Sequence, residues 1–137
     1  MVRLRDIISI SKPVRISSDA TVDEALVTMI ENKTDFLLVN RTGIDDAYGM
    51  ITKRDLIDGV VSKGLDMTST PVVECSRKPV VAVNNLDLDI RWVAKKMSNE
   101  GVSKLMVFDR EEFLGYVSDV DILRAVAGKS SAGRAET

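Results

Sequence analysis

The sequence predicts a mixed α/β protein made of two βαββα repeats, packed face to face with pseudo-two-fold symmetry. Three observations lead to this prediction. Short apolar runs and apolar residues at helical spacing follow one another in the same order twice. A segment of Gly, two apolar residues, a hydroxyl, two variable residues, Asp and two aliphatics occurs at 49–57 and again at 115–123. One repeat of about 60 residues would also be only marginally stable alone, because a chain of that size buries only about 60% of its unfolded surface.

The first repeat begins with a strand and a helix. Residues 1–12 end in isoleucines that should pack on the main body, although the stretch is too short for an element of its own. Residues 13–16 alternate and predict a short strand, and 17–20 form a turn. Thr21 opens a helix, because Glu24 follows three places later as in a capping box. Its apolar face consists of Val22, Ala25, Leu26, Met29 and Ile30.

Two strands and a second helix complete this repeat. Residues 36–39 are a continuous apolar run, which predicts a buried strand. The chain returns as a strand at 48–51 after a polar connection at 41–46. Thr52 opens the second helix, which Gly64 is expected to end. Its expected apolar face consists of Leu56, Ile57, Val60 and Val61.

The pattern then returns. Residues 78–80 repeat 12–14 at an offset of 66 residues, and the offset becomes 68 in the following helix and buried strand. It returns to 66 in the last segment, as small insertions in surface loops would cause. Gly101 should end the helix of this repeat. We therefore divide the chain into a first repeat at 1–64, a linker and lead-in at 65–78, a second repeat at 79–128 and a disordered tail at 129–137.

Composition argues against several functional classes. The chain has no histidine, which removes the commonest general base and zinc ligand, and no nucleophile cluster is evident, so we expect no enzyme. Its one cysteine, Cys75, cannot form an intrachain disulfide, and its context predicts a half-buried strand residue. The acidic pairs Asp45–Asp46 and Glu111–Glu112 lack further ligands for a metal.

Charge and hydropathy limit the expected partners and location. A net charge of -2 and an aromatic content of 4% argue against a nucleic-acid binder. No run of 18 apolar residues is present, so we expect no membrane span. The N-terminus lacks the apolar region of a signal peptide, and the expected location is the cytoplasm.

The repeated segments are the candidate functional sites. Thr52 precedes Asp55 by three residues at a helix start, and Ser118 precedes Asp121 in the same way. The pairs are either capping boxes that stabilise the helices by about 0.5–2 kcal/mol or groups that bind phosphates and ribose hydroxyls.

The two segments differ in charge. Lys53 and Arg54 place two cations in the first segment, which favours a ligand with phosphates there. Asp119 and Val120 hold these positions in the second, where a carboxylate would repel phosphates. We therefore predict that the first segment is the stronger nucleotide site. The second could take an uncharged or cationic group, use Arg124 as a counter-charge, or stay empty.

Two βαββα repeats that each end in Gly-x-Val/Ile-Ser/Thr-x-x-Asp-Ile/Leu resemble a pair of CBS (cystathionine β-synthase) domains over about residues 1–128. The resemblance implies a stand-alone regulatory module that senses AMP, ADP or ATP, or S-adenosylmethionine, and acts on a separate, unknown protein. It also implies a homodimer of flat, four-repeat form, with ligand clefts where the repeats meet.

The resemblance also implies roles for individual residues. Asp55 and Asp121 would contact the ribose hydroxyls, and Thr52 and Ser118 would lie near the phosphates. Lys53 and Arg54 would add positive charge. The residues implied on the adenine side are Val14, Ile16, Asp35, Val80, Val83 and Ser103.

An alternative to the nucleotide sensor is a ligand-free interaction scaffold in which both motifs only cap helices. Trp92 lies off the apolar face of its helix and either marks an interface or packs on the chain's own loops. Lys95 and Lys96 are expected on a solvated face.

Overall fold

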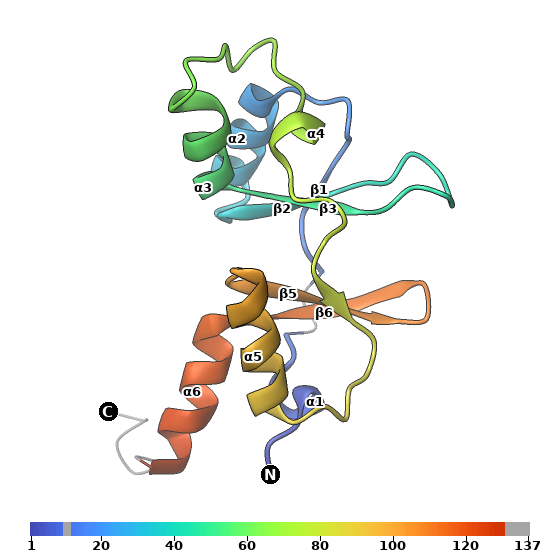
Figure 1. Cartoon of the computed structure of the whole chain (residues 1–137), viewed down its shortest axis with the longest axis vertical. Coiled ribbons are helices and arrows are strands. Elements are labelled where there is room, and N and C mark those ends of the chain that lie inside the picture. The colour runs from blue at the N-terminus through green and yellow to red at the C-terminus, as the bar shows by residue number, and fades with distance from the viewer. Residues whose placement is uncertain (10–11, 131–137) are drawn as a thin grey trace. The chain divides into compact units, whose positions relative to one another are not determined.

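A computed structural model describes residues 1–9 and 12–130. The chain forms two compact units, each with a three-stranded sheet and covering helices (Figure 1). One unit is the continuous stretch Pro13–Val80, and the other combines the N-terminal segment up to Lys12 with the chain from Val81 onward. The predicted mixed α/β class with two repeats is confirmed.

The 13–80 unit has a sheet in the order β1-β2-β3, in which β1 is parallel to β2 and β2 is antiparallel to β3. Its elements are β1 (Arg15–Ile16), α2 (Val22–Glu31), β2 (Phe36–Val39), β3 (Gly49–Thr52), α3 (Lys53–Leu56), the π-helical turn η1 (Ile57–Val61) and α4 (Val72–Cys75).

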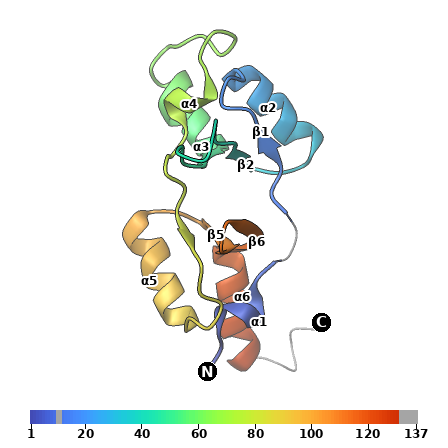
Figure 2. The same cartoon turned by 90° about the vertical axis from the view of Figure 1, so that its right-hand side faces the viewer.

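The other unit repeats this topology with the sheet order β4-β5-β6 (Figure 2). Its elements are α1 (Leu4–Ile7), β4 (Ala82–Val83), α5 (Ile90–Glu100), β5 (Lys104–Asp109), β6 (Glu112–Ser118) and α6 (Asp119–Ser130). Helix α6 includes the first two residues of the predicted disordered tail, and the rest of that tail lies outside the described residues.

Strand pairing corrects the sequence match between the repeats by one residue. The N–H of Leu38 donates to the carbonyl of Val14 (2.9 Å), and the N–H of Met106 donates to that of Val81 (3.1 Å). Val81 is therefore the structural counterpart of Val14, whereas the offset of 66 had pointed to Val80.

The long helices begin and end largely where the sequence predicts. Thr21 caps α2 by accepting from the N–H of Glu24 (3.2 Å), and Gly101 ends α5 with a φ of 67°. The prediction that Ile30 belongs to the apolar face of α2 is wrong, because its side chain is 61% exposed. At 3.6 residues per turn it points about 100° away from the buried Met29.

The sequence patterns did not predict α1 and α4, two short helices that precede the first strand of each repeat and are called lead-in helices below. Leu4 of α1 is fully buried in the core of the second unit, and Val72 of α4 in the core of the first. The expected packing of residues 1–12 is therefore observed, but as a helix. Cys75 is half-buried as predicted, but it ends α4 instead of lying in a strand, because the chain turns after Pro71 and Ser76 donates to the Val72 carbonyl (2.9 Å).

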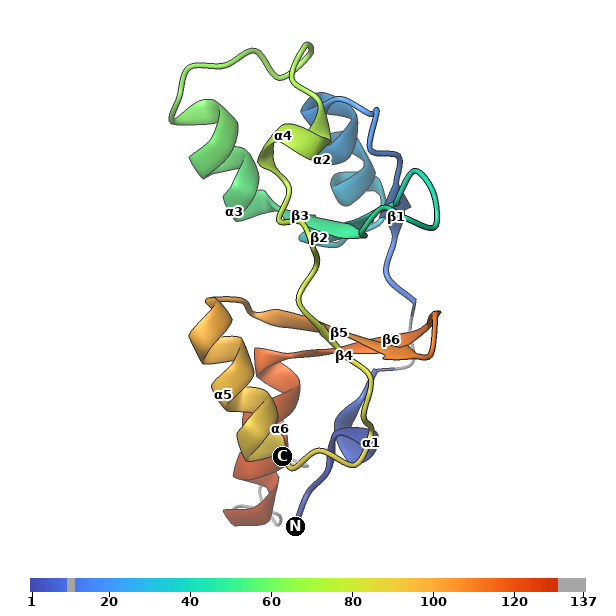
Figure 3. The same cartoon turned by 45° about the vertical axis from the view of Figure 1, so that its right-hand side comes forward.

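Each of these short helices lies near a long helix, α4 near α2 and α1 near α5 (Figure 3). Backbone hydrogen bonds join it to the start of that helix. In the first unit the N–H of Val72 donates to Ala20 (2.8 Å) and that of Val22 to Thr70 (2.9 Å). In the second unit the N–H of Leu4 donates to Leu88 in the same way (2.8 Å). This pattern makes α1 and α4 equivalent elements.

The helix after Thr52 also differs from the prediction. Helix α3 passes into the π-turn η1, and only half of the expected apolar face is buried: Leu56 and Val60 are inside, while Ile57 and Val61 are exposed. Within the described residues, none of the helices has the length and hydropathy needed to cross a membrane.

Candidate functional site

The first motif is a complete capping box at the junction of β3 and α3. The N–H of Thr52 donates to Oδ2 of Asp55 (2.8 Å), and the N–H of Asp55 donates to Oγ1 of Thr52 (3.1 Å). Both side chains are half-buried. The second carboxylate oxygen of Asp55 has no hydrogen bond to any described residue.

The second motif has the same geometry at the junction of β6 and α6. The N–H of Ser118 donates to Oδ2 of Asp121 (2.8 Å), and the N–H of Asp121 donates to Oγ of Ser118 (3.2 Å). The Ser118 hydroxyl also donates to the same Oδ2 (3.0 Å). Both motifs therefore act as helix caps, and each holds its carboxylate in a fixed direction.

Backbone hydrogen bonds bring the predicted adenine-side residues Asp35 and Ser103 to the motifs. The N–H of Lys53 donates to the carbonyl of Asp35, and the N–H of Asp119 donates to that of Ser103, both at 3.0 Å. Each residue lies just before the central strand of its sheet.

The other four adenine-side candidates are less closely associated with the motifs. Val14 and Ile16 lie in or beside β1, where Ile16 is part of the core and only 9% exposed. Val80 donates to the carbonyl of Tyr48 (2.8 Å) in the first unit, whereas Val83 lies in β4 of the second. Val80 and Val83 therefore lie in different units, and neither unit alone contains both.

The two cations of the first motif are both exposed. Arg54 forms an ion pair with Asp58 one turn later (Nε–Oδ2 3.1 Å), but its side chain is 79% exposed, so the pair contributes little. The Lys53 ammonium has no hydrogen bond or ion pair among the described residues. Lys53 is therefore the more available cation for a ligand.

Sequence reasoning missed the contribution of the lead-in helices to both motif regions. Burial, followed by the negative charge of Asp55, raises the pKa of the Cys75 thiol of α4. In the other unit, Asp6 of α1 and Asp121 line one groove of about 350 Å³. The available signal was a sequence match of residues 72–73 to 6–7 at an offset of 66, which marked both stretches as parts of the repeat. The hydrogen bonds of Leu4 and Val72 correct this offset to 68.

Two further sequence hypotheses can be placed on the structure. Trp92 is 49% exposed, and the Lys96 ammonium lies 5.9 Å from the centre of its ring. Among residues 1–9 and 12–130, no group of three His, Cys, Asp or Glu side chains is arranged to hold a metal ion.

Comparison with known proteins identifies the family. An uncharacterized protein of Methanopyrus kandleri is 32% identical over 81 residues, which cover 58% of this chain but only 41% of that relative. The structure of a hexameric CBS-CP12 protein from bloom-forming cyanobacteria is 28% identical and has a TM-score of 0.83, covering 98% of this chain and 77% of that one.

A CBS domain protein from Pyrobaculum aerophilum, solved in complex with AMP, shares the fold at 19% identity and a TM-score of 0.73, covering 92% of this chain and 98% of that one. The CBS domain family model matches residues 3–62 and 67–128. The chain therefore belongs to the CBS domain family and carries a pair of these domains.

Proposed function

We propose that this protein is a non-catalytic regulatory module that binds an adenine nucleotide (AMP, ADP or ATP) at Thr52 and Asp55. The observation that carries the proposal is the combination of an oriented carboxylate with an unpaired oxygen and the uncommitted Lys53 beside it. A carboxylate oxygen accepts ribose hydroxyls well, and an ammonium attracts phosphate. The AMP complex of the Pyrobaculum aerophilum relative supports this choice of ligand.

The second motif is the weaker nucleotide site in this proposal, because Asp119 replaces Lys53 beside the capping box. A ligand with less negative charge, such as S-adenosylmethionine, is the alternative there. We propose that the remaining adenine-side residues named above complete the two sites.

Regulation would follow from a shift in conformational populations. A ligand present at about one hundred times its dissociation constant stabilises the state that binds it by about 2.7 kcal/mol, which is enough to bias a two-state assembly. We propose a cytoplasmic homo-oligomer, a dimer in the simplest case, that reports this change to a separate protein. The hexameric CBS-CP12 relative supports self-association.

Thermal unfolding with and without AMP, ADP, ATP and S-adenosylmethionine at millimolar concentration tests the proposal. We expect a higher Tm with one of these ligands, a loss of the shift in Asp55→Asn, and no loss in the matched control Asp58→Asn. Asparagine can still accept the Thr52 hydrogen bond, so this variant removes the charge while it keeps the cap.

The complete hydrogen bonding of both capping boxes favours a second candidate, the ligand-free interaction scaffold. No Tm shift with any of the four ligands in a folded protein would establish it over the sensor. If Asp121→Asn abolished AMP binding while Asp55→Asn left it unchanged, the choice of the first motif as the stronger site would be wrong.

A further inference from the structure

A groove between α1 and α6 lies next to the second motif. Its volume of about 350 Å³ is at the lower end of the roughly 300–1,000 Å³ range of small-molecule sites. The groove lies within a single compact unit, although its two walls come from opposite ends of the chain. The lining residues are Val2, Asp6, Ile7, Asp121, Arg124 and Ala125.

Charges of both signs line this groove without neutralising each other. The Arg124 guanidinium forms no hydrogen bond or ion pair with any described residue, although it shares the groove with two carboxylates. Asp6 uses only Oδ2, which accepts from the N–H of Arg3 (2.8 Å), and Asp121 uses only Oδ2 to cap α6. One oxygen of each carboxylate is therefore still able to accept a hydrogen bond.

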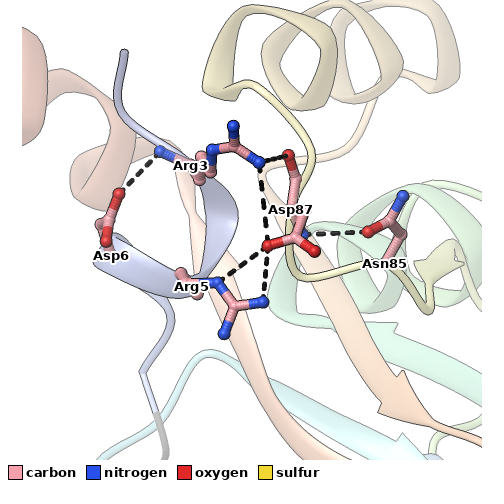
Figure 4. A network of polar contacts seen from close by, with 5 residues as sticks. All are labelled: Arg3, Arg5, Asp6, Asn85 and Asp87. Carbon is pink, nitrogen blue, oxygen red and sulfur yellow. Dashed lines mark hydrogen bonds and ion pairs between the residues drawn. The ribbon is translucent and has the colours of Figure 1, made fainter.

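The α1 wall of the groove is held in place by contacts on the loop before α5. Figure 4 shows the guanidinium groups of Arg3 and Arg5 directed to Asp87, whose own N–H donates to Asn85 (2.9 Å). Arg5 Nε donates to the Asp87 carboxylate (2.9 Å) and Arg3 donates to the Asp87 carbonyl (3.4 Å). Both arginines thus contact Asp87, and neither serves as the counter-charge of Asp6.

The equivalent place in the 13–80 unit is built differently. The repeat offset of 66 aligns Arg124 with Asp58 and Ala125 with Gly59. The equivalent backbone hydrogen bonds of Leu4 and Val72 align Ile7 with Cys75. There, α4 packs so closely on η1 that a Cβ on Gly59 would lie 2.8 Å from the Cβ of Cys75. The combination of a mixed-charge groove and an unpaired guanidinium therefore belongs to the unit with α6.

We propose that the α1–α6 groove binds a small zwitterion, an α-amino acid with an apolar side chain. Arg124 pairs with the ligand carboxylate, for which the guanidinium fork is well suited. The unpaired oxygens of Asp6 and Asp121 accept from the ligand ammonium. Val2, Ile7 and Ala125 provide the apolar contact for its side chain. This site shares Asp121 with the second, weaker motif, but it is separate from the nucleotide site proposed at Thr52 and Asp55 and does not depend on it.

Titration of the ¹⁵N-labelled full-length protein with L-leucine and L-methionine at millimolar concentration, without nucleotide, tests the proposal by NMR. We expect saturable shifts at the backbone amides of Asp6, Ile7, Arg124 and Ala125. Leucinamide, which lacks the carboxylate, and 4-methylpentanoate, which lacks the ammonium, should bind about tenfold more weakly or not at all.

Arg124→Asp introduces the residue type of the equivalent Asp58 and should abolish the chemical-shift response. Arg124→Gln should abolish it too, and this variant adds no negative charge to the groove. Lys95→Asp on α5 makes the same charge change outside the groove and should respond as the wild type does. No saturable response to either amino acid, an equal response to leucinamide, or full binding by both Arg124 variants would overturn the proposal. These outcomes are independent of Asp55, so they are distinguishable from a failure of nucleotide binding.

Discussion

The hydroxyl and carboxylate of each motif form the same capping box in both units, so the differences between the two sites come from the residues between them. Lys53 and Arg54 in one unit are replaced by Asp119 and Val120 in the other. The cap geometry exists without any ligand, because it satisfies backbone N–H groups at a helix start. A ligand site at these motifs therefore uses a carboxylate that the fold has already oriented.

The capping role of Thr52 can be measured directly. Thr52→Ala removes the acceptor for the Asp55 N–H (3.1 Å), and the free energy of unfolding should fall by about 1 kcal/mol, within the usual range of about 0.5–2 for a lost cap. Urea unfolding monitored by circular dichroism gives this value. Thr52→Ser keeps the hydroxyl and should stay within a few tenths of the wild type, whereas an unchanged Thr52→Ala would refute the capping role.

Asp46 should make the free energy of unfolding depend on pH in the acidic range. The Lys78 ammonium beside it, and then the backbone N–H of Thr42, hold the pKa of Asp46 well below its usual value of 3.8. Because the folded pKa is lowered, this contribution to stability is fully present above the unfolded pKa and is lost as the pH falls below it. The urea midpoint of the wild type should therefore drop more steeply below about pH 4 than that of Asp46→Asn.

Lys78→Met provides the second half of this test. It removes the group that contributes most to the lowered pKa of Asp46, so its urea midpoint should fall less steeply with acid than that of the wild type. Equal slopes for all three proteins would show that the ion pair has no part in the acid response.

The elements that the sequence predicted well are those with a long or unambiguous pattern. The buried strand at 36–39 and the start of α2 after Thr21 agree with the prediction. The lead-in helices were missed because each has four residues, and hydrogen bonds to distant backbone groups hold them in place. A helix of one turn is too short to show a periodic pattern of apolar residues. Hydrogen bonds to distant backbone groups cannot be predicted from a local pattern.

The motif hydroxyls and carboxylates were identifiable because their spacing is local. Asp6 and Cys75 were not, since their proximity to Asp121 and Asp55 depends on how the lead-in helices cross between the repeats. Ile57 and Val61 were assigned to the core because they are apolar and lie beside Leu56 and Val60, yet both side chains are exposed, as is Leu123, the counterpart of Ile57, in the regular helix α6.

The contact between α4 and η1 predicts an effect of Gly59. A methyl group at this position would lie 2.8 Å from the Cβ of Cys75, so Gly59→Ala should destabilise the protein by about 1–3 kcal/mol through overpacking. Gly43→Ala is a matched control, because a Cβ there meets nothing within 4 Å. Urea midpoints of the two variants give the comparison, and equal midpoints would contradict the close packing of α4.

At the scale of the whole molecule, sequence repeats and compact units have different boundaries. The repeat assigned to 1–64 contains α1, which packs in the other unit, and lacks α4, whose Val72 is fully buried in the first core. The continuous stretch Pro13–Val80 contains every member of that core. Each of the two stretches that match the CBS family model, 3–62 and 67–128, therefore supplies one short helix to the unit of the other.

Two fragments of similar length distinguish these boundaries. Fragment 13–80 should unfold cooperatively in urea, because it retains Val72 and the whole first core. Fragment 1–64 should unfold at lower urea concentration or without cooperativity, because it loses a buried side chain, at a cost of about 1.5–3 kcal/mol, together with the hydrogen bonds that α4 makes. A fragment 1–64 as stable as 13–80 would show that α4 is dispensable.

The exchange of lead-in helices also sets an order of events during protein synthesis. Leu4, Ile7 and Ile8 are synthesised long before the rest of their core, which begins at Val81. At about 5–20 residues per second, these apolar side chains wait for several seconds until the C-terminal half has been made. The 13–80 stretch is complete earlier and can fold while translation continues. These three residues are thus made before the 13–80 stretch but reach their native position after it, and in that interval they are open to chaperones or to a neighbouring nascent chain.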